Sequence, residues 1–191
     1  MDTITHTMLG AALCSRTGLA GGLRGAVRRD GSPRLVDWTF WAALFFGAFP
    51  DVASLGIHLV PRLFMEGYGM WRDIPPYIFT LYRCTHSLVI IALCLLVVRL
   101  LFRPLFIPML AWPFHVVSDV FTHGPGRFQT PILYPVSEFK YAGVNWWEHP
   151  EITYTAWALT VAFWIVILCL RYWNQVSWKR SSRPLAERTG S

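Results

Sequence analysis

Long apolar runs alternate with short polar segments along this chain of 191 residues. The last run, residues 154–173, holds twenty residues with a single charge, Arg171. A helix of that length can cross a hydrocarbon layer about 30 Å thick. Pro50-Asp51 interrupts the second run without ending it. The pattern predicts five apolar segments, residues 3–22, 38–60, 86–102, 104–122 and 154–173.

The connecting segments complete the predicted fold. Residues 61–83 mix aromatic, charged, Pro and Gly residues, which is typical of a segment at the membrane interface. We therefore predict an all-α fold, a polytopic membrane helical bundle with about four to five spans plus this interfacial segment. Residues 1–176 are expected to form a single membrane-embedded domain. Residues 177–191 are expected to be a polar, disordered cytoplasmic tail.

Composition supports a membrane protein over a soluble one. Hydrophobic residues make up 54% of the chain and charged residues 15%, against about 25% charged in ordinary soluble domains. The alternative is a soluble all-helical protein with a large apolar core. The nearly uncharged segment 154–173 argues against that alternative.

The net charge of +6 comes from basic residues that flank apolar segments. This is the distribution that the positive-inside rule gives for cytoplasmic ends, and it does not require nucleic acid as a partner. We therefore predict a multi-pass protein of the inner (plasma) membrane whose partner is the lipid bilayer. Twelve of the seventeen basic residues fall in three clusters: Arg16, Arg24, Arg28, Arg29 and Arg34; Arg99 and Arg103; Arg171, Lys179, Arg180, Arg183 and Arg188.

Ionisable residues recur in or beside the apolar segments. His115, Asp119 and His123 are spaced by four residues, so a helix would place them on one face. Charged groups at membrane depth are costly and usually line a functional site. Imidazole and carboxylate are ligands that zinc favours. The predicted metal ligands are His6, Asp51, His86, His115 and Asp119.

Depth along the helices agrees with a shared site. With the basic clusters in the cytoplasm, all five predicted ligands lie roughly 17–24 Å from the cytoplasmic ends of their segments. This places the site toward the external side. Three ligands also have structural readings: His115 and Asp119 as a buried hydrogen-bonded pair, and Asp51 as a helix cap after Pro50. His6 lies so near the terminus that it could simply reach water.

Two further residues are predicted to act in catalysis. His123 could protonate a leaving group, or it could be solvated just beyond the membrane. Glu148, at the mouth of the last span, is the best-placed additional carboxylate, although polar residues are common at the interface.

Four motifs carry a resemblance to a known family: MDTITHTMLG at the start, FPD near residue 50, THS at 85–87 and HVVSDVFTHG at 115–124. Together they resemble the YdjM-type family of inner-membrane-bound metal-dependent hydrolases, over residues 1 to about 124. The resemblance implies a polytopic membrane protein with a hydrolytic metal site. The ligand order is also similar to that of zinc-dependent phospholipase C and related single-strand nucleases. The chain lacks a clear second His-x-x-x-Glu helix, which a full three-metal cluster of that kind would need.

The sequence thus favours hydrolysis assisted by a divalent metal, zinc or alternatively manganese, with one or more ions. The expected substrate is a small molecule or lipid, a phosphate ester or a lipid-linked compound at the outer membrane face. The alternative is a non-catalytic metal-binding or transport protein. Haem is disfavoured by the carboxylates Asp51 and Asp119, and the metalloprotease motif H-E-x-x-H is absent from the sequence.

Overall fold

A computed structural model describes residues 1–22, 26–27, 33–66 and 73–181 of the chain. It confirms the all-α membrane bundle. A two-residue antiparallel ladder, β1 with β2, is the exception to helix among the elements described. The elements are α1 (Thr3–Cys14), η1 (Leu19–Gly21), β1 (Ala26–Val27), β2 (Pro33–Arg34), α2 (Trp38–Asp51), η2 (Val52–Gly56), α3 (Ile57–Glu66), α4 (Pro76–Thr85), α5 (Leu88–Leu101), η4 (Arg103–Leu105), α6 (Phe106–Met109), α7 (Ala111–Thr122), η5 (Trp146–Glu148) and α8 (Pro150–Ser181).

Three helical runs in the described chain are long and apolar enough to cross a membrane. They are Trp38–Met65, Arg103–Thr122 and Pro150–Trp178. The helices α4 and α5 pass the same test together, with a bend of 57° between them, and would give a fourth span. The number of spans is therefore three or four by length and composition, and the first predicted segment is not among them.

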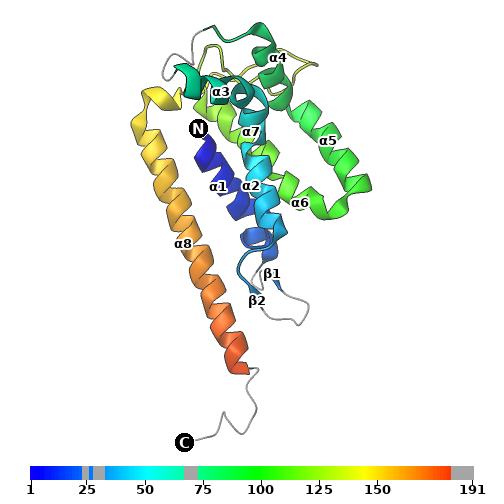
Figure 1. The fold of residues 1–191 in the computed structure, drawn as a ribbon, viewed down its shortest axis with the longest axis vertical. Coiled ribbons are helices and arrows are strands. Elements are labelled where there is room, and N and C mark those ends of the chain that lie inside the picture. The colour runs from blue at the N-terminus through cyan, green and yellow to red at the C-terminus, as the bar shows by residue number, and fades with distance from the viewer. Residues whose placement is uncertain (23–25, 28–32, 67–72, 182–191) are drawn as a thin grey trace, which may run out of the picture.

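The first segment differs from the prediction because its helix ends early. The helix α1 covers only Thr3–Cys14, which at 1.5 Å per residue is roughly 18 Å. Ser15 stops it by donating its hydroxyl proton to the carbonyl oxygen of Ala11. In Figure 1, α1 lies in the middle of the bundle beside α2, α7 and α8. It is a short internal helix that carries its first turn, and His6, to one end of the bundle.

Close contact between α1 and α2 depends on glycine. A Cβ atom on Gly47 would lie 2.9 Å from the carbonyl oxygen of His6 and 3.0 Å from Cα of Thr7. Small residues at such a crossing let two backbones approach in lipid, where packing rather than hydrophobic burial drives association. Gly47 therefore fixes the height and distance of His6 relative to α2.

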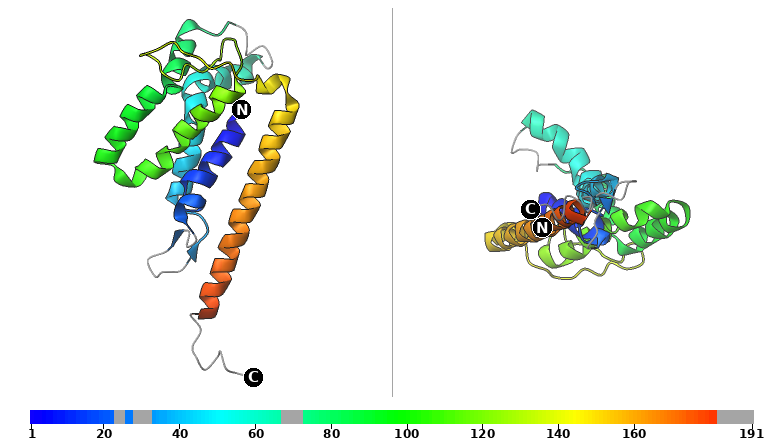
Figure 2. Two further views of the ribbon diagram at one scale, coloured as in Figure 1. Left: turned by 180° about the vertical axis from the view of Figure 1, so that it is seen from behind. Right: turned by 90° about the horizontal axis from the view of Figure 1, so that it is seen from below.

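The helix α8 runs alongside α1, as both side views in Figures 1 and 2 show. The indole of Trp157 donates to Asp2 at 3.0 Å, and that of Trp164 donates to the carbonyl of Met8 at 3.1 Å. These bonds attach the long outer helix to the short inner one. The helix α8 continues to Ser181, past the predicted boundary at residue 176, and residues 182–191 of the predicted tail lie outside the described residues.

The segment predicted at the interface, residues 61–83, forms the end of α3 and most of α4, with residues 67–72 outside the described part. The break between α4 and α5 lies at residues 86–87. There the hydroxyl of Ser87 accepts from the backbone of Ile90 and caps α5. The indole of Trp112 on α7 donates to the carbonyl of Thr85 at 2.7 Å. The break, and His86 within it, is thereby held against α7.

Candidate metal centre

Four side chains from three places in the fold meet at one end of the bundle. They are Asp51 at the end of α2, His86 at the α4–α5 break, and His115 and Asp119 one turn apart on α7. One ligand atom from each lies within 4.8 Å of the other three. His86, His115 and Asp119 are buried, and the side chain of Asp51 is 19% exposed. We call these four residues the ligand cluster.

Distances within the ligand cluster match a tetrahedral cation site. Oδ2 of Asp119 lies 3.3 Å from Nε2 of His115 and 3.5 Å from Nε2 of His86. Oδ1 of Asp51 lies 3.5 Å from Nε2 of His115 and 3.7 Å from that of His86. A zinc ion about 2.0–2.1 Å from each of four donors separates them by about 3.3–3.4 Å. These four nitrogen–oxygen distances, 3.3–3.7 Å, are therefore close to those in a four-coordinate zinc site, and all donors lie within 4.8 Å of one another.

The same distances disfavour direct hydrogen bonding as the purpose of the cluster. Histidine–carboxylate hydrogen bonds are about 2.7–3.2 Å long, shorter than all four separations. No residue in the described part of the chain forms a hydrogen bond with Nε2 of His86 or of His115. Buried polar atoms rarely lack a partner in a native protein. A cation between the donors would supply that partner.

Backbone carbonyls orient both imidazole rings. Nδ1 of His115 donates to the carbonyl of Gly47 at 2.7 Å. Nδ1 of His86 lies 3.0 Å from the carbonyl of Tyr82 and 3.1 Å from the hydroxyl of Thr85. With the proton on Nδ1, each ring presents the lone pair of Nε2 to the ligand cluster. Metal-binding histidines are held by this kind of second hydrogen bond.

The outer carboxylate oxygens are also engaged. Oδ2 of Asp51 accepts from the hydroxyl of Thr3 at 2.5 Å. Oδ1 of Asp119 lies 2.9 Å from the amino nitrogen of Met1 and 2.7 Å from Nε2 of His6. One oxygen of each carboxylate is therefore taken up by α1 and its first residues, and the other faces the ligand cluster.

His6 thus lies beside the cluster and directly contacts two of its members, His115 and Asp119. Its ring stacks on that of His115 with centroids 3.8 Å apart. Its Nε2 is shared between Asp119 and the carbonyl of Met1 at 3.0 Å. The structure therefore brings the five predicted ligands together. His6 lies next to the four residues of the ligand cluster and is not one of them.

The two residues predicted to act in catalysis are separated by the structure. His123 caps the end of α7, is 8% exposed, and has Nδ1 3.4 Å from Oδ1 of Asp119. Burial lowers the pKa of His123 to about 4, so its ring is neutral near pH 7. Glu148 is exposed in η5, where it accepts from the amide of Asn145 at 2.9 Å. Glu148 is not brought to the ligand cluster.

A comparison with models of protein families shows to which family the chain belongs. The model of the YdjM inner membrane protein family matches residues 1–186. The chain belongs to the YdjM family. It is therefore an inner-membrane protein, which agrees with its three or four candidate spans. No curated protein and no solved structure matches the chain.

Several residues of this YdjM-family site have no signal in the sequence. Gly47 contributes a backbone carbonyl, and every residue has one. Tyr82 stacks on His86 with ring centroids 3.9 Å apart, but one aromatic residue among many gives no pattern. Thr3, which bonds to Asp51, lies three residues before His6. Helical spacing places the two residues on one face, so the position of Thr3 near the site could have been predicted.

An apolar cleft of about 200 Å³ reaches this YdjM-family site from the side of the bundle. It lies between α1 and α7, and His6 and His115 form its inner wall. Its outer rim includes Phe114 and Val117, which are 49% and 42% exposed. In a bilayer these exposed apolar residues face lipid. The cleft therefore connects the lipid-facing surface with the two stacked imidazoles.

Proposed function

We propose that this protein is a membrane-bound, metal-dependent hydrolase that acts on a phosphate ester or a lipid-linked substrate. The observation that carries the proposal is the ligand cluster, whose four donor atoms lie within 4.8 Å of one another and whose two imidazole Nε2 atoms have no hydrogen-bond partner among the described residues. Two imidazoles and two carboxylates are a donor set suited to zinc, and manganese is the alternative.

The residues present fit the ion well. Asp51, His86, His115 and Asp119 would hold it, and Gly47, Tyr82 and Thr3 would keep three of these ligands in place. When bound, such an ion supplies Lewis acidity, which polarises an ester oxygen and lowers the pKa of water. Asp51 is the most exposed of the four, so access to the ion is expected from its side.

His123 is the residue that we assign to proton transfer. Its Nδ1 lies 3.1 Å from the carbonyl of Asp119, so this nitrogen donates inward and Nε2 carries the lone pair. A buried imidazole next to a metal ligand can take a proton from water or return one to a leaving group. The apolar cleft between α1 and α7 supports a substrate with a lipid-like part.

The orientation of the site is part of the proposal. His6 lies in the first half of α1, and Arg16 follows its end. His86 precedes α5, and Arg103 follows it. In both cases the basic residue lies at the opposite end of the helix from the site. By the positive-inside rule the ligand cluster then lies toward the external side of the inner membrane.

One observation favours a second function, non-catalytic metal binding. Structural zinc sites have four protein ligands, whereas catalytic sites usually have three and keep one position open. The ligand cluster offers four. Under the hydrolase proposal, Asp51, the most exposed of the four, would be the ligand on the side from which water reaches the site. The two functions therefore differ in turnover and agree in metal content.

The test combines metal analysis with activity. Detergent-purified protein is expected to contain about one zinc or manganese ion per chain or more, and to hydrolyse a chromogenic phosphate ester or a phospholipid. Chelation should abolish hydrolysis and metal should restore it. Asp119→Asn and His115→Ala should lose both metal and activity. His149→Ala and Glu151→Gln are the matched controls, since these two side chains are exposed and pair with each other.

Each failure has its own meaning. If both ligand variants keep the full metal content, the ligand cluster does not bind the metal and the proposal is wrong. If the metal is lost in these variants but wild-type protein hydrolyses no phosphate ester or phospholipid, the protein binds metal without catalysis.

A further inference from the structure

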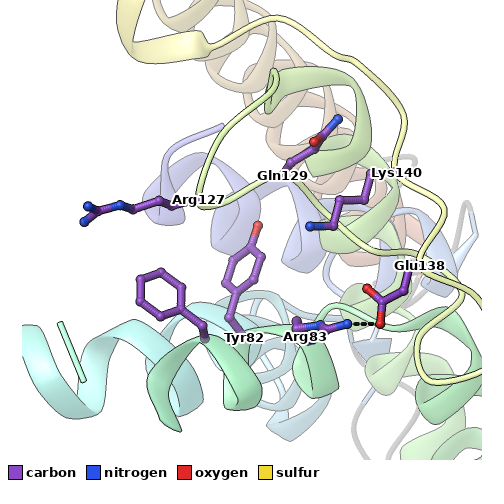
Figure 3. A pocket seen from close by; sticks show the side chains of 7 residues that line it. Tyr82, Arg83, Arg127, Gln129, Glu138 and Lys140 are labelled. Atoms are coloured by element: carbon purple, nitrogen blue, oxygen red, sulfur yellow. Dashed lines mark hydrogen bonds and ion pairs between the residues drawn. The ribbon is translucent and has the colours of Figure 1, made fainter. Parts of the chain in front are cut away.

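A second cavity lies on the far side of Tyr82 from the ligand cluster. Its volume is about 290 Å³, close to the lower size of small-molecule sites. It is formed by α4 and by the loop that follows α7, as Figure 3 shows. We call it the basic pocket. Its polar lining consists of Tyr82, Arg83, Arg127, Gln129, Glu138 and Lys140.

The charge of the basic pocket is unbalanced. It has three cationic side chains and one carboxylate, Glu138, which gives an excess of two positive charges. Glu138 pairs with Arg83. Neither Arg127 nor Lys140 forms an ion pair with any other residue in the described ranges. Cations gathered around a cavity create a positive potential that attracts anions. A dianion would balance the excess charge.

Arg83 is held in place for such an anion. Its guanidinium lies over the ring of Tyr134, 4.4 Å from the centroid, and one of its terminal nitrogens bonds to Glu138. Its Nε is buried and has no hydrogen-bond partner in the part of the chain that the structure describes. A guanidinium held on two sides in this way is suited to phosphate, which arginine binds through charge-assisted N–H contacts.

The other two cations differ in their placement. In Figure 3 the amino group of Lys140 points into the space above Tyr82, while the guanidinium of Arg127 extends away from it. Lys140 is therefore expected to contact a bound anion directly. Arg127 is expected to act from the rim, mainly through its charge.

Tyr82 connects the basic pocket with the metal centre. Its ring lines the pocket on one side and stacks on His86 on the other, with centroids 3.9 Å apart. Its hydroxyl donates to the carbonyl of Phe128 at 2.6 Å, which ties the ring to the loop that forms the opposite wall. The two sites are thus one side chain apart, at the same end of the bundle.

We propose that the basic pocket binds a phosphate-type dianion, either free phosphate or the phosphate of a lipid head group. Phosphate fits better than a carboxylate because its two negative charges balance the excess charge of the pocket. A phosphate also has enough acceptor oxygens for both Arg83 and Lys140. This site rests on different residues from the ligand cluster and does not depend on the proposed hydrolysis.

Binding to the full-length protein in detergent tests the proposal. Two probes distinguish the sources of the anion: inorganic phosphate, and a short-chain phosphatidic acid below its micellar concentration. Short-chain phosphatidylcholine, which has no net charge, is the negative probe. Binding of either anionic probe supports the proposal and names the source. Failure of both to bind wild-type protein at millimolar concentration would overturn it.

Variants locate the binding. Lys140→Gln should weaken the affinity about tenfold, the value of one charge-assisted contact, and Arg127→Gln about threefold. Arg103→Gln is the matched control, an exposed arginine in η4 at the other end of α5, and should change affinity by less than about twofold. An equal loss in all three variants would mean general attraction to a basic protein, and would overturn the assignment.

A variant that binds phosphate more tightly than wild type tests the pocket independently, because poor folding cannot explain higher affinity. Glu138→Gln removes the carboxylate that competes for Arg83, so affinity should rise about threefold. A fall in affinity would contradict the proposal. Metal content should equal that of wild type in every pocket variant, and Asp119→Asn should still bind phosphate. These two results separate a failure of the basic pocket from a failure of the metal centre.

Discussion

Two of the buried polar sites in the described part of this bundle, Arg171 and the ligand cluster, are satisfied in opposite ways. Arg171 on α8, 7% exposed, donates to the carbonyls of Thr17 at 3.1 Å, Gly22 at 2.6 Å and Gly18 at 2.5 Å. All three acceptors belong to the turns after α1. In the ligand cluster, by contrast, the Nε2 atoms of two imidazoles and the carboxylate oxygens face one another at 3.3–3.7 Å, and neither Nε2 forms a hydrogen bond with a described residue.

The contrast distinguishes a buried group that stabilises the fold from a group of side chains that binds a metal ion. A buried charge that is surrounded by complementary backbone groups needs nothing more, and its role is to hold α8 against the end of α1. Converging acceptors raise the energy of the fold unless a cation lies among them. The arginine is therefore expected to matter for stability alone, and the ligand cluster for metal binding. Three variants can break or sharpen this division.

Gly47→Ala should have the largest effect, because Gly47 serves both packing and the metal centre. The added Cβ would lie 2.9 Å from the carbonyl of His6, so α1 must move away from α2. The carbonyl of Gly47 also holds Nδ1 of His115. We expect metal affinity to fall about 10- to 100-fold, as when an outer contact of a ligand is lost. The measurement is a metal-competition titration, together with thermal unfolding in detergent.

Gly56→Ala is the matched control for this variant. Its added Cβ would make only ordinary contacts, the shortest 3.4 Å, with its own helical run. It should bind metal like wild type. If Gly47→Ala also binds metal like wild type, the close approach of α1 and α2 does not set the geometry of the ligand cluster.

Arg171→Met should have the second largest effect, confined to stability. Methionine keeps the length and apolar stem of the side chain but removes the donor to the three close carbonyls and to that of Arg16 at 3.5 Å. Hydrogen bonds to a charged group are worth about 1.5–3 kcal/mol each in net terms, so we expect Tm to fall by roughly 10 °C or more. Metal content should stay at the wild-type value.

Arg99→Met, an exposed position on α5, serves as the control and should change Tm by less than about 2 °C. A large loss of metal in Arg171→Met would show that the two ends of the bundle are coupled, and the division above would fail.

The sequence predicted the ligand cluster better than the helices that carry it. The four-residue spacing of His115 and Asp119 survives any error in helix length, because it is local. Counting residues along their segments placed Asp51 and His86 at the same level as His115 and Asp119, and the structure brings the four together. The length of α1 was not predicted: residues 3–22 are rich in Gly and Ala on both sides of Ser15 and Arg16, and the helix ends at Ser15 and the turn that follows.

Contacts made by the backbone were equally hidden from the sequence. The carbonyls of Gly47 and Tyr82 decide which nitrogen of each histidine faces the cluster, and no residue type encodes a carbonyl. The acceptors of Arg171 are carbonyls as well. For this reason the sequence grouped Arg171 with the basic residues at the membrane surface, whereas the structure buries it.

Glu148→Gln is expected to have the smallest effect. The sequence predicted a catalytic role for this carboxylate, but in the structure it accepts from the amide of Asn145, whose own oxygen accepts from the backbone of Gly124 at 2.8 Å. Glutamine can keep that contact through its side-chain oxygen. Metal content and the rate of hydrolysis should therefore remain within about twofold of wild type, as they should for Glu151→Gln, an exposed acid nearby that pairs with His149.

A selective loss of rate in Glu148→Gln, with metal intact, would change the comparison itself. It would mean that the loop after α7 brings a carboxylate to the substrate during turnover, so that a surface residue with complete hydrogen bonds is nevertheless functional. The rule that a polar group with complete hydrogen bonds is structural would then hold for Arg171, which is buried. It would not hold for exposed groups in the loop that contacts the substrate. Measuring both variants at saturating and at low substrate separates a role in binding from a role in catalysis.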